Sequence, residues 1–246
     1  MISLLKWNIK NEWFKWKTYF DDTVNTKAKL SDISRQLVYE YLKCVNSPLL
    51  NENIEYKELL KRLKVVDKDY RPLNIGLLMF NLSPDKFFPS CFIKIILGNG
   101  KVERIFTGQL DWQLSCTLNY VENMAIAEKI FKIPDQAETI RIKSYIFCAI
   151  KVFIINTFYH KDYKANVPII IKIDEDKISI SNPIGNNKRV GNFLKELDFV
   201  KEEKNGIANV LKVIEKNNYP LPTFTIDQDA DIFVVEIPIH PVFIND

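Results

Sequence analysis

The chain has 246 residues, of which 47% are hydrophobic and 26% are charged, as is typical of soluble globular proteins. The net charge of +3 is too small for a dedicated nucleic-acid-binding protein, and the 7 glycines leave few residues for a glycine-rich phosphate loop. The first residues do not form a secretory signal, and no apolar run is long enough to span a bilayer, which predicts a cytoplasmic protein without a membrane partner. The four cysteines lie far apart and form no CxxC pair, so we expect buried, reduced thiols and no zinc site.

Residues 1–19 form an aromatic and basic segment, in which Trp7, Trp13 and Trp16 lie among lysines. Such a segment can bind nucleic acid, because bases stack on aromatic rings. It can also be an amphipathic element that packs on the body of the protein or anchors a protein partner, because tryptophan is usually buried. Both interpretations stay open at this point.

The next part of the chain predicts two helices and two strands. Apolar residues recur at helical spacing over 31–46, with Ser31 as the expected N-cap, and over 56–66. The apolar runs at 73–81 and 91–100 predict strands separated by a turn that contains prolines.

The C-terminal half alternates between helical and strand patterns. A β-branched run, a short polar turn and a clean alternation over 166–183 predict a hairpin. Two closing strands are expected at "TFTI" and at 231–239, and helices are expected over 112–131, about 138–158, 190–200 and 207–218. This mixture predicts an α/β or α+β fold with a mixed sheet.

Five stretches in this order carry a resemblance that covers about residues 20–240. They read YFDDTVNTKAKLSDIS, LNIGLLMFNLSPDKFFPS, YIFCAIKVFIINTFYHKDY, IKIDEDKISISNPIG and KNGIANVLKVIEKNNYPLPTF. Together they resemble the bacterial transcriptional regulators related to the DNA helicase RecG, which carry an AlbA-type (Schlafen-like) DNA-binding domain and a C-terminal module similar to GHKL ATPases. The resemblance implies an aromatic-basic segment at 1–19, a family-specific helical and α+β domain at 20–110, and a GHKL-like α/β sandwich at 111–246, without the AlbA-type domain.

The resemblance also implies a nucleotide site at the end of the helix that contains NTFYHKDY. In GHKL ATPases a glutamate on this helix orients the attacking water, and an asparagine one turn later holds Mg²⁺. Here Asn156 is retained as the implied Mg²⁺ ligand, whereas Val152 occupies the glutamate position and can neither position a water nor accept its proton. No catalytic residue is therefore implied.

The remaining implied site is incomplete. Ile184 stands where the family has a glycine, and the loop NNKR is too short to form the lid that closes over phosphates. The residues implied to bind the cofactor, ATP with Mg²⁺, are Asn156, His160, Asp162, Asn182, Gly185 and Gly206. Each has a structural alternative: Asn156 can cap the helix C-terminus, and His160 and Asp162 can form a local pair that ends the helix.

Three functions are consistent with these residues. The first is a regulator-like protein whose degenerate ATP-binding module hydrolyses inefficiently or not at all. The second is a protein-interaction or dimerisation scaffold with an empty pocket, which would act as a homo-oligomer or through the aromatic N-terminus. The third is a slow Mg²⁺-dependent ATPase in which Asp162 replaces the glutamate; a missing general base costs about 10²–10⁴-fold in rate, which disfavours it. DNA binding has little support, because the domain expected to carry it is missing.

Overall fold

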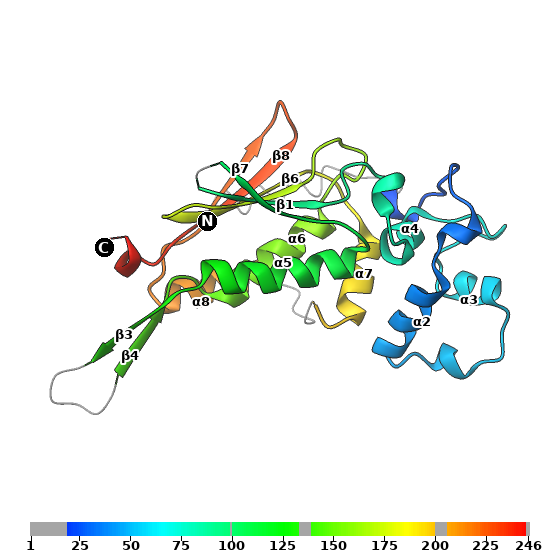
Figure 1. The fold of residues 1–246 in the computed structure, drawn as a ribbon, viewed down its shortest axis with the longest axis horizontal. Coiled ribbons are helices and arrows are strands. Elements are labelled where there is room, and N and C mark those ends of the chain that lie inside the picture. Colours follow the sequence, from blue (N-terminus) through cyan, green and yellow to red (C-terminus); the bar gives the residue numbers. More distant parts are fainter. Residues whose placement is uncertain (1–18, 99, 133–138, 200–205, 245–246) are drawn as a thin grey trace.

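The computed structural model describes residues 19–98, 100–132, 139–199 and 206–244, and Figure 1 shows their arrangement. Helices and a mixed sheet combine in an α+β fold, as predicted. A helical N-terminal part lies beside a six-stranded sheet that carries helices against one face (Figure 1). Of the aromatic-basic segment only Tyr19 belongs to the described residues, so both interpretations of that segment stay predictions. Among the helices of these ranges, none combines the length and apolar character needed to cross a membrane.

The N-terminal part consists of short helices and 3-10 turns. Ser34 caps the first long helix, since its Oγ accepts a hydrogen bond from the Leu37 N–H at 3.4 Å. The predicted cap, Ser31, instead lies in the preceding 3-10 turn. The elements are η1 (Phe20–Asp22), η2 (Leu30–Asp32), α2 (Arg35–Cys44), η3 (Pro48–Asn51), α3 (Tyr56–Arg62), α4 (Asn74–Phe80) and η4 (Pro84–Lys86).

The predicted strand over 73–81 is wrong, because this stretch forms helix α4. All 7 residues of α4 are buried, so the helix has no polar face, and its sequence pattern is indistinguishable from that of a buried strand. Gly76 lets α4 approach the preceding chain closely, since a Cβ at this position would lie 2.8 Å from the Val65 carbonyl oxygen.

The central sheet has the strand order β2-β1-β5-β6-β8-β7. β1 and β5 are parallel and every other neighbouring pair is antiparallel. The predicted hairpin over 166–183 and the three other predicted strands outside the α4 region are confirmed. The bounds are β1 (Ile93–Leu97), β2 (Val102–Phe106), β5 (Ile169–Ile173), β6 (Lys177–Pro183), β7 (Thr223–Asp227) and β8 (Ile232–Pro238). β1 and β2 precede residue 111, and β1 pairs with β5, which follows it, so one sheet joins both sides of the predicted domain boundary.

Helices α5 and α6 lie along one face of this sheet (Figure 1). Buried isoleucines of β1, β5 and β6 and apolar residues of the helices belong to the same hydrophobic core. Hydrophobic burial of this kind is the main force that holds the layers together. The helices are α5 (Leu110–Ala125), α6 (Phe147–Tyr159), α7 (Lys188–Glu196) and α8 (Gly206–Lys216), and a turn η5 (Pro241–Phe243) follows the last strand.

A separate hairpin interrupts the region predicted as helix over 112–131 and 138–158. Both helices are confirmed only in part, because α5 ends at Ala125 and α6 begins at Phe147. Between them, β3 (Glu128–Lys132) and β4 (Thr139–Lys143) form a two-stranded sheet of their own. The short alternating stretches EKIFK and TIRIK contain the β-branched and aromatic residues that favour strands, which the longer helical windows obscured.

The N-terminal part is joined to α7 by a buried carboxylate. Asp21 Oδ2 accepts hydrogen bonds from the backbone N–H groups of Arg189 and Val190, at 2.6 and 2.9 Å, and so caps a helix distant in sequence. The Arg189 guanidinium in turn binds Asp22 and the Leu63 carbonyl oxygen, each at 3.1 Å. Burial raises the pKa of Asp21 to about 6.

All four cysteines are free thiols, as predicted. The predicted burial holds for Cys91 only: Cys116 is half-buried, and Cys44 and Cys148 are exposed on the outer sides of their helices. Within the described ranges, no cluster of three or more His, Cys, Asp or Glu side chains is placed to hold a metal ion.

Candidate functional site

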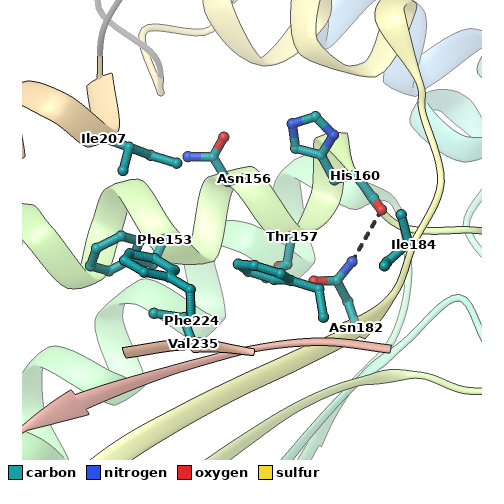
Figure 2. Close-up of a pocket in the computed structure, with 10 residues that line it drawn as sticks. Phe153, Asn156, Thr157, His160, Asn182, Ile184, Ile207, Phe224 and Val235 are labelled. Atoms are coloured by element: carbon teal, nitrogen blue, oxygen red, sulfur yellow. Dashed lines mark hydrogen bonds between the residues drawn. The ribbon is translucent and has the colours of Figure 1, made fainter. Parts of the chain in front are cut away.

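A small cavity lies between α6 and the strands β6, β7 and β8 (Figure 2). The volume that the centre of a water molecule can occupy is about 30 Å³, which is room for about two waters. Three segments distant in sequence meet there: α6, the end of β6, and the α8–β8 region. The lining residues are Phe153, Asn156, Thr157, His160, Asn182, Ile184, Ile207, Phe224, Phe233 and Val235.

The structure brings three of the sequence-predicted residues together at this cavity. Asn156 and His160 reach it from α6, and Asn182 reaches it from β6. Gly206 precedes the lining residue Ile207, whereas Asp162 and Gly185 are not among the lining residues.

Asn182 is the buried polar group of the cavity, with an exposed fraction of 1%. Its Nδ2 donates to the His160 carbonyl oxygen at 3.1 Å and to the Pro183 carbonyl oxygen at 3.0 Å. Because both partners are acceptors, the amide orientation is fixed. The Oδ1 atom is therefore held on the other side, where Figure 2 shows it turned away from His160, and it has no hydrogen-bond donor among the described residues. A buried acceptor without a donor is costly, so this atom can accept a hydrogen bond from a ligand.

Asn156 lies one turn before His160, on the side of α6 nearest Ile207 (Figure 2). Its Nδ2 donates to the Val152 carbonyl oxygen of the same helix at 2.7 Å. Protein-bound Mg²⁺ usually has one or two carboxylate ligands besides waters and substrate phosphates. Among the described residues that line the cavity there is neither Asp nor Glu, so Asn156 would supply a single neutral oxygen, and these residues fit Mg²⁺ poorly.

His160 ends α6, where its backbone N–H donates to the Asn156 carbonyl oxygen at 2.9 Å. Burial lowers the pKa of its imidazole to about 4, so the ring is neutral at neutral pH. Asp162 lies in the following turn, where its carboxylate accepts a hydrogen bond from the Lys164 N–H at 2.9 Å. Asp162 therefore stabilises a local turn and does not reach the cavity, which removes the carboxylate that could have replaced the missing glutamate.

The two predicted glycines have different surroundings. A Cβ at Gly185 would lie 2.5 Å from the Lys161 carbonyl oxygen and 2.6 Å from the Asp162 backbone nitrogen. Gly185 is thus required for the packing of its own chain against the end of α6. A Cβ at Gly206 would meet only a methyl group of Val152 at 3.8 Å, so the described surroundings leave this glycine free of steric constraint.

Three phenylalanines form the apolar wall of the cavity, and sequence reasoning missed them. Phe153 and Phe224 meet edge to face with ring centroids 5.8 Å apart, and Phe224 stacks on Phe233 at 6.2 Å. The alternating pattern of the two closing strands could have indicated Phe224 and Phe233, because every second side chain of a strand points to the same face of the sheet. Together with the other lining side chains, these rings leave only about 30 Å³ for water-sized groups, so a purine needs the lining to rearrange.

Asn187 is a second buried amide that sequence reasoning missed. It is fully buried, and its Nδ2 donates to the carbonyl oxygens of Tyr159 at 3.2 Å and Lys161 at 2.7 Å. The buried amine of Lys161 donates to the Val167 carbonyl oxygen at 2.5 Å, and burial lowers its pKa to about 8. Asn187 lies directly before helix α7, a position that asparagine favours. Its hydrogen-bond partners belong to the end of α6, so they could not be predicted from the neighbouring residues.

Comparison with known proteins supports the fold without identifying a function. No family model and no curated protein matches the sequence. Among solved structures, the DIP2311 protein from Corynebacterium diphtheriae is similar over 94% of this chain, with a TM-score of 0.60 and 14% sequence identity. The chain spans 50% of the length of that protein. At this identity the likeness concerns the fold alone.

Proposed function

We propose that the cavity is a degenerate nucleotide site in a regulator-like protein, which binds the base of an adenine nucleotide and does not hydrolyse it efficiently. The observation that supports this function is the fixed, buried Oδ1 of Asn182, which lacks a donor within the described structure. The exocyclic amine of adenine is such a donor, whereas guanine presents a carbonyl at the equivalent position. The regulator part of the proposal rests on the family resemblance of the five sequence stretches.

The chemistry available in the cavity argues against efficient hydrolysis. Val152 replaces the expected glutamate, and the lining residues within the described part of the chain include no Asp, Glu, Lys or Arg. A missing general base alone lowers a rate by about 10²–10⁴-fold. Recognition of the base therefore has more support than recognition of the phosphates or Mg²⁺, and a slow Mg²⁺-dependent ATPase has the least support.

A second candidate function is a scaffold whose pocket holds no nucleotide. The stacked rings of Phe153, Phe224 and Phe233 favour it, because they leave room for only about two waters. In that case the polar groups at the end of α6 serve folding, and the protein acts through partners that contact its surface.

Calorimetric titration distinguishes these candidates. We expect adenosine, ADP and ATP to bind with dissociation constants in the micromolar to submillimolar range, with little dependence on Mg²⁺ and no comparable binding of guanosine. Absence of heat at millimolar adenine nucleotide would contradict the nucleotide site and leave the scaffold. Equal binding of guanosine would mean that Asn182 does not select the 6-amino group of adenine.

A matched pair of variants localises the binding. Ile207→Trp places a large ring in the cavity and should abolish binding, because Ile207 lines it. Val213→Trp lies on the same helix at a position that is 39% exposed, and should leave binding unchanged. Equal affinities of the two variants would place any nucleotide outside this cavity.

A further inference from the structure

The β3–β4 hairpin, here called the arm (residues 128–132 and 139–143), projects away from the body of the protein (Figure 1). In the part of the chain that the structure describes, its two strands form ladders only with each other. An isolated two-stranded hairpin is marginally stable in water, because it has little surface to bury. The arm therefore has a structural reason to contact something outside its own body.

The register gives the arm two different faces. Side chains directly opposite each other share a face, and successive side chains alternate between faces. The pairs Phe131–Ile140 and Lys129–Ile142 therefore form one face, which is apolar apart from Lys129. The opposite face carries the pairs Glu128–Lys143, Ile130–Arg141 and Lys132–Thr139, and is mostly charged or polar.

The C-terminal turn of the same chain covers only the base of the apolar face. The Lys129 ammonium donates to the Val242 carbonyl oxygen at 3.0 Å and lies 5.0 Å from the centre of the Phe243 ring. Further along the arm, Phe131 and Ile140 are 41% and 49% exposed. The apolar strip thus continues from η5 onto the outer half of the arm, where large side chains face solvent.

The charges of the arm fit a protein partner better than nucleic acid. Arg141 is paired with Glu128 at 3.2 Å, and residues 128–143 contain four basic and three acidic residues. Binding to nucleic acid rests on a concentration of positive charge against phosphates, which this near-neutral segment lacks. The Lys129 ammonium, the cation on the apolar face, is already held by η5.

We propose that the apolar face of the arm packs against the same face of a second copy of this chain, and that the protein forms a two-fold symmetric dimer through its arms. A two-fold interface requires a self-complementary surface, which a continuous apolar strip provides without opposing like charges. Antiparallel packing places Phe131 and Ile140 of one arm over the region of Phe243 and Ile244 of the other, and Ile244 is itself 56% exposed. The charged faces of both arms stay in water. Because only a few apolar side chains make up the strip, the dimer is weak and concentration-dependent.

Sedimentation velocity of the full chain, from low micromolar to several hundred micromolar, tests this dimer. Reductant must be present, because the exposed Cys44 and Cys148 could otherwise form disulfides between copies. We expect a reversible shift from monomer to dimer as the concentration rises. Phe131→Ser and Ile140→Ser should each weaken association by at least about tenfold, because each removes an apolar anchor of the interface.

Ile130→Ser is the matched control. Ile130 is adjacent to Phe131 and 53% exposed, but lies on the opposite face of the arm, so its loss should leave the dimer unchanged. A monomer at every concentration would overturn the proposal, as would an equal loss in Ile130→Ser and Phe131→Ser. Thermal unfolding of each variant separates a lost interface from a lost fold, since substitutions at these exposed sites should leave the melting temperature of the monomer nearly unchanged.

Discussion

The proposed site has two ends, which differ in how firmly packing and hydrogen bonds hold the residues that the resemblance implied. We call them the firm end, with Asn182 and Gly185, and the loose end, with Asn156 and Gly206. At the end of α6, Asn182 bridges two carbonyl oxygens, and Gly185 lies against the backbone with no space for a side chain. One turn earlier, Asn156 bonds to a carbonyl of its own helix, and Gly206 has space for a Cβ. Packing therefore accounts for Gly185 and for the amide nitrogen of Asn182, whereas Asn182 Oδ1 is left without a donor among the described residues. Packing gives no reason for an asparagine and a glycine at the loose end.

The largest difference between the two ends should appear in a pair of glycine substitutions. Gly185→Ala forces a Cβ into the backbone of Lys161 and Asp162, and should lower the free energy of unfolding by about 3 kcal/mol. Gly206→Ala adds a Cβ at an ordinary contact distance from Val152 at the start of a helix, and should change the free energy of unfolding by less than about 1 kcal/mol. Urea unfolding of both variants measures the two changes. Similar losses of stability in the two variants would mean that both ends are packed alike, which would contradict the difference described above.

Some elements and residues around the site could be predicted from the sequence, and others could not. The hairpin β5–β6 and the helices around the site followed from local alternation and spacing, which are written in neighbouring residues. Helix α4 and the arm did not, because a fully buried helix has no polar face and two short strands were hidden inside helical windows. The resemblance gathered Asn156, His160 and Asn182, and the structure brings them to one cavity. It missed Asn187 and the capping role of Asp21, whose partners are backbone atoms distant in sequence.

A second test of the firm end removes a buried amide. Asn187→Ala leaves the carbonyl oxygens of Tyr159 and Lys161 without its two hydrogen bonds, and should cost about 2 kcal/mol of stability. The measurement is the midpoint of chemical unfolding, combined with amide hydrogen exchange at the end of α6. Exchange that stays as slow as in the wild type would show that Asn187 does not hold this turn.

The pH dependence of stability should report on His160, which belongs to the same firm end. Its pKa is lowered from 6.5 to about 4 by burial, so between these pH values the unfolded chain binds the proton and the folded chain does not. This contribution is present above pH 6.5 and is lost as the pH falls toward 4, by about 3 kcal/mol in all. Asp21 acts in the opposite sense, because its raised pKa of about 6 makes the folded chain bind the proton first and lose stability as the pH rises from 3.8 to 6.

The variant His160→Gln separates these two opposing groups. Without the histidine, the contribution of Asp21 remains, so the stability of this variant should fall more steeply than that of the wild type as the pH rises from about 4 to 6. In Asp21→Asn the histidine contribution remains, and stability should rise more steeply with pH over the same range. Parallel profiles for His160→Gln and the wild type would show that His160 is not held neutral by burial.

The smallest expected effect on stability is that of Asn156→Ala, at the loose end. Alanine is the best helix former, and the hydrogen bond lost is one to the Val152 carbonyl of the same helix, so we expect a change of less than about 0.5 kcal/mol. This makes Asn156→Ala the cleanest probe of whether the loose end meets a ligand. If the proposed site holds only the base, the variant binds adenosine like the wild type, with or without Mg²⁺. A loss confined to ATP with Mg²⁺ would mean that Asn156 still meets the metal and phosphates, and that the site is less degenerate than its missing carboxylate indicates.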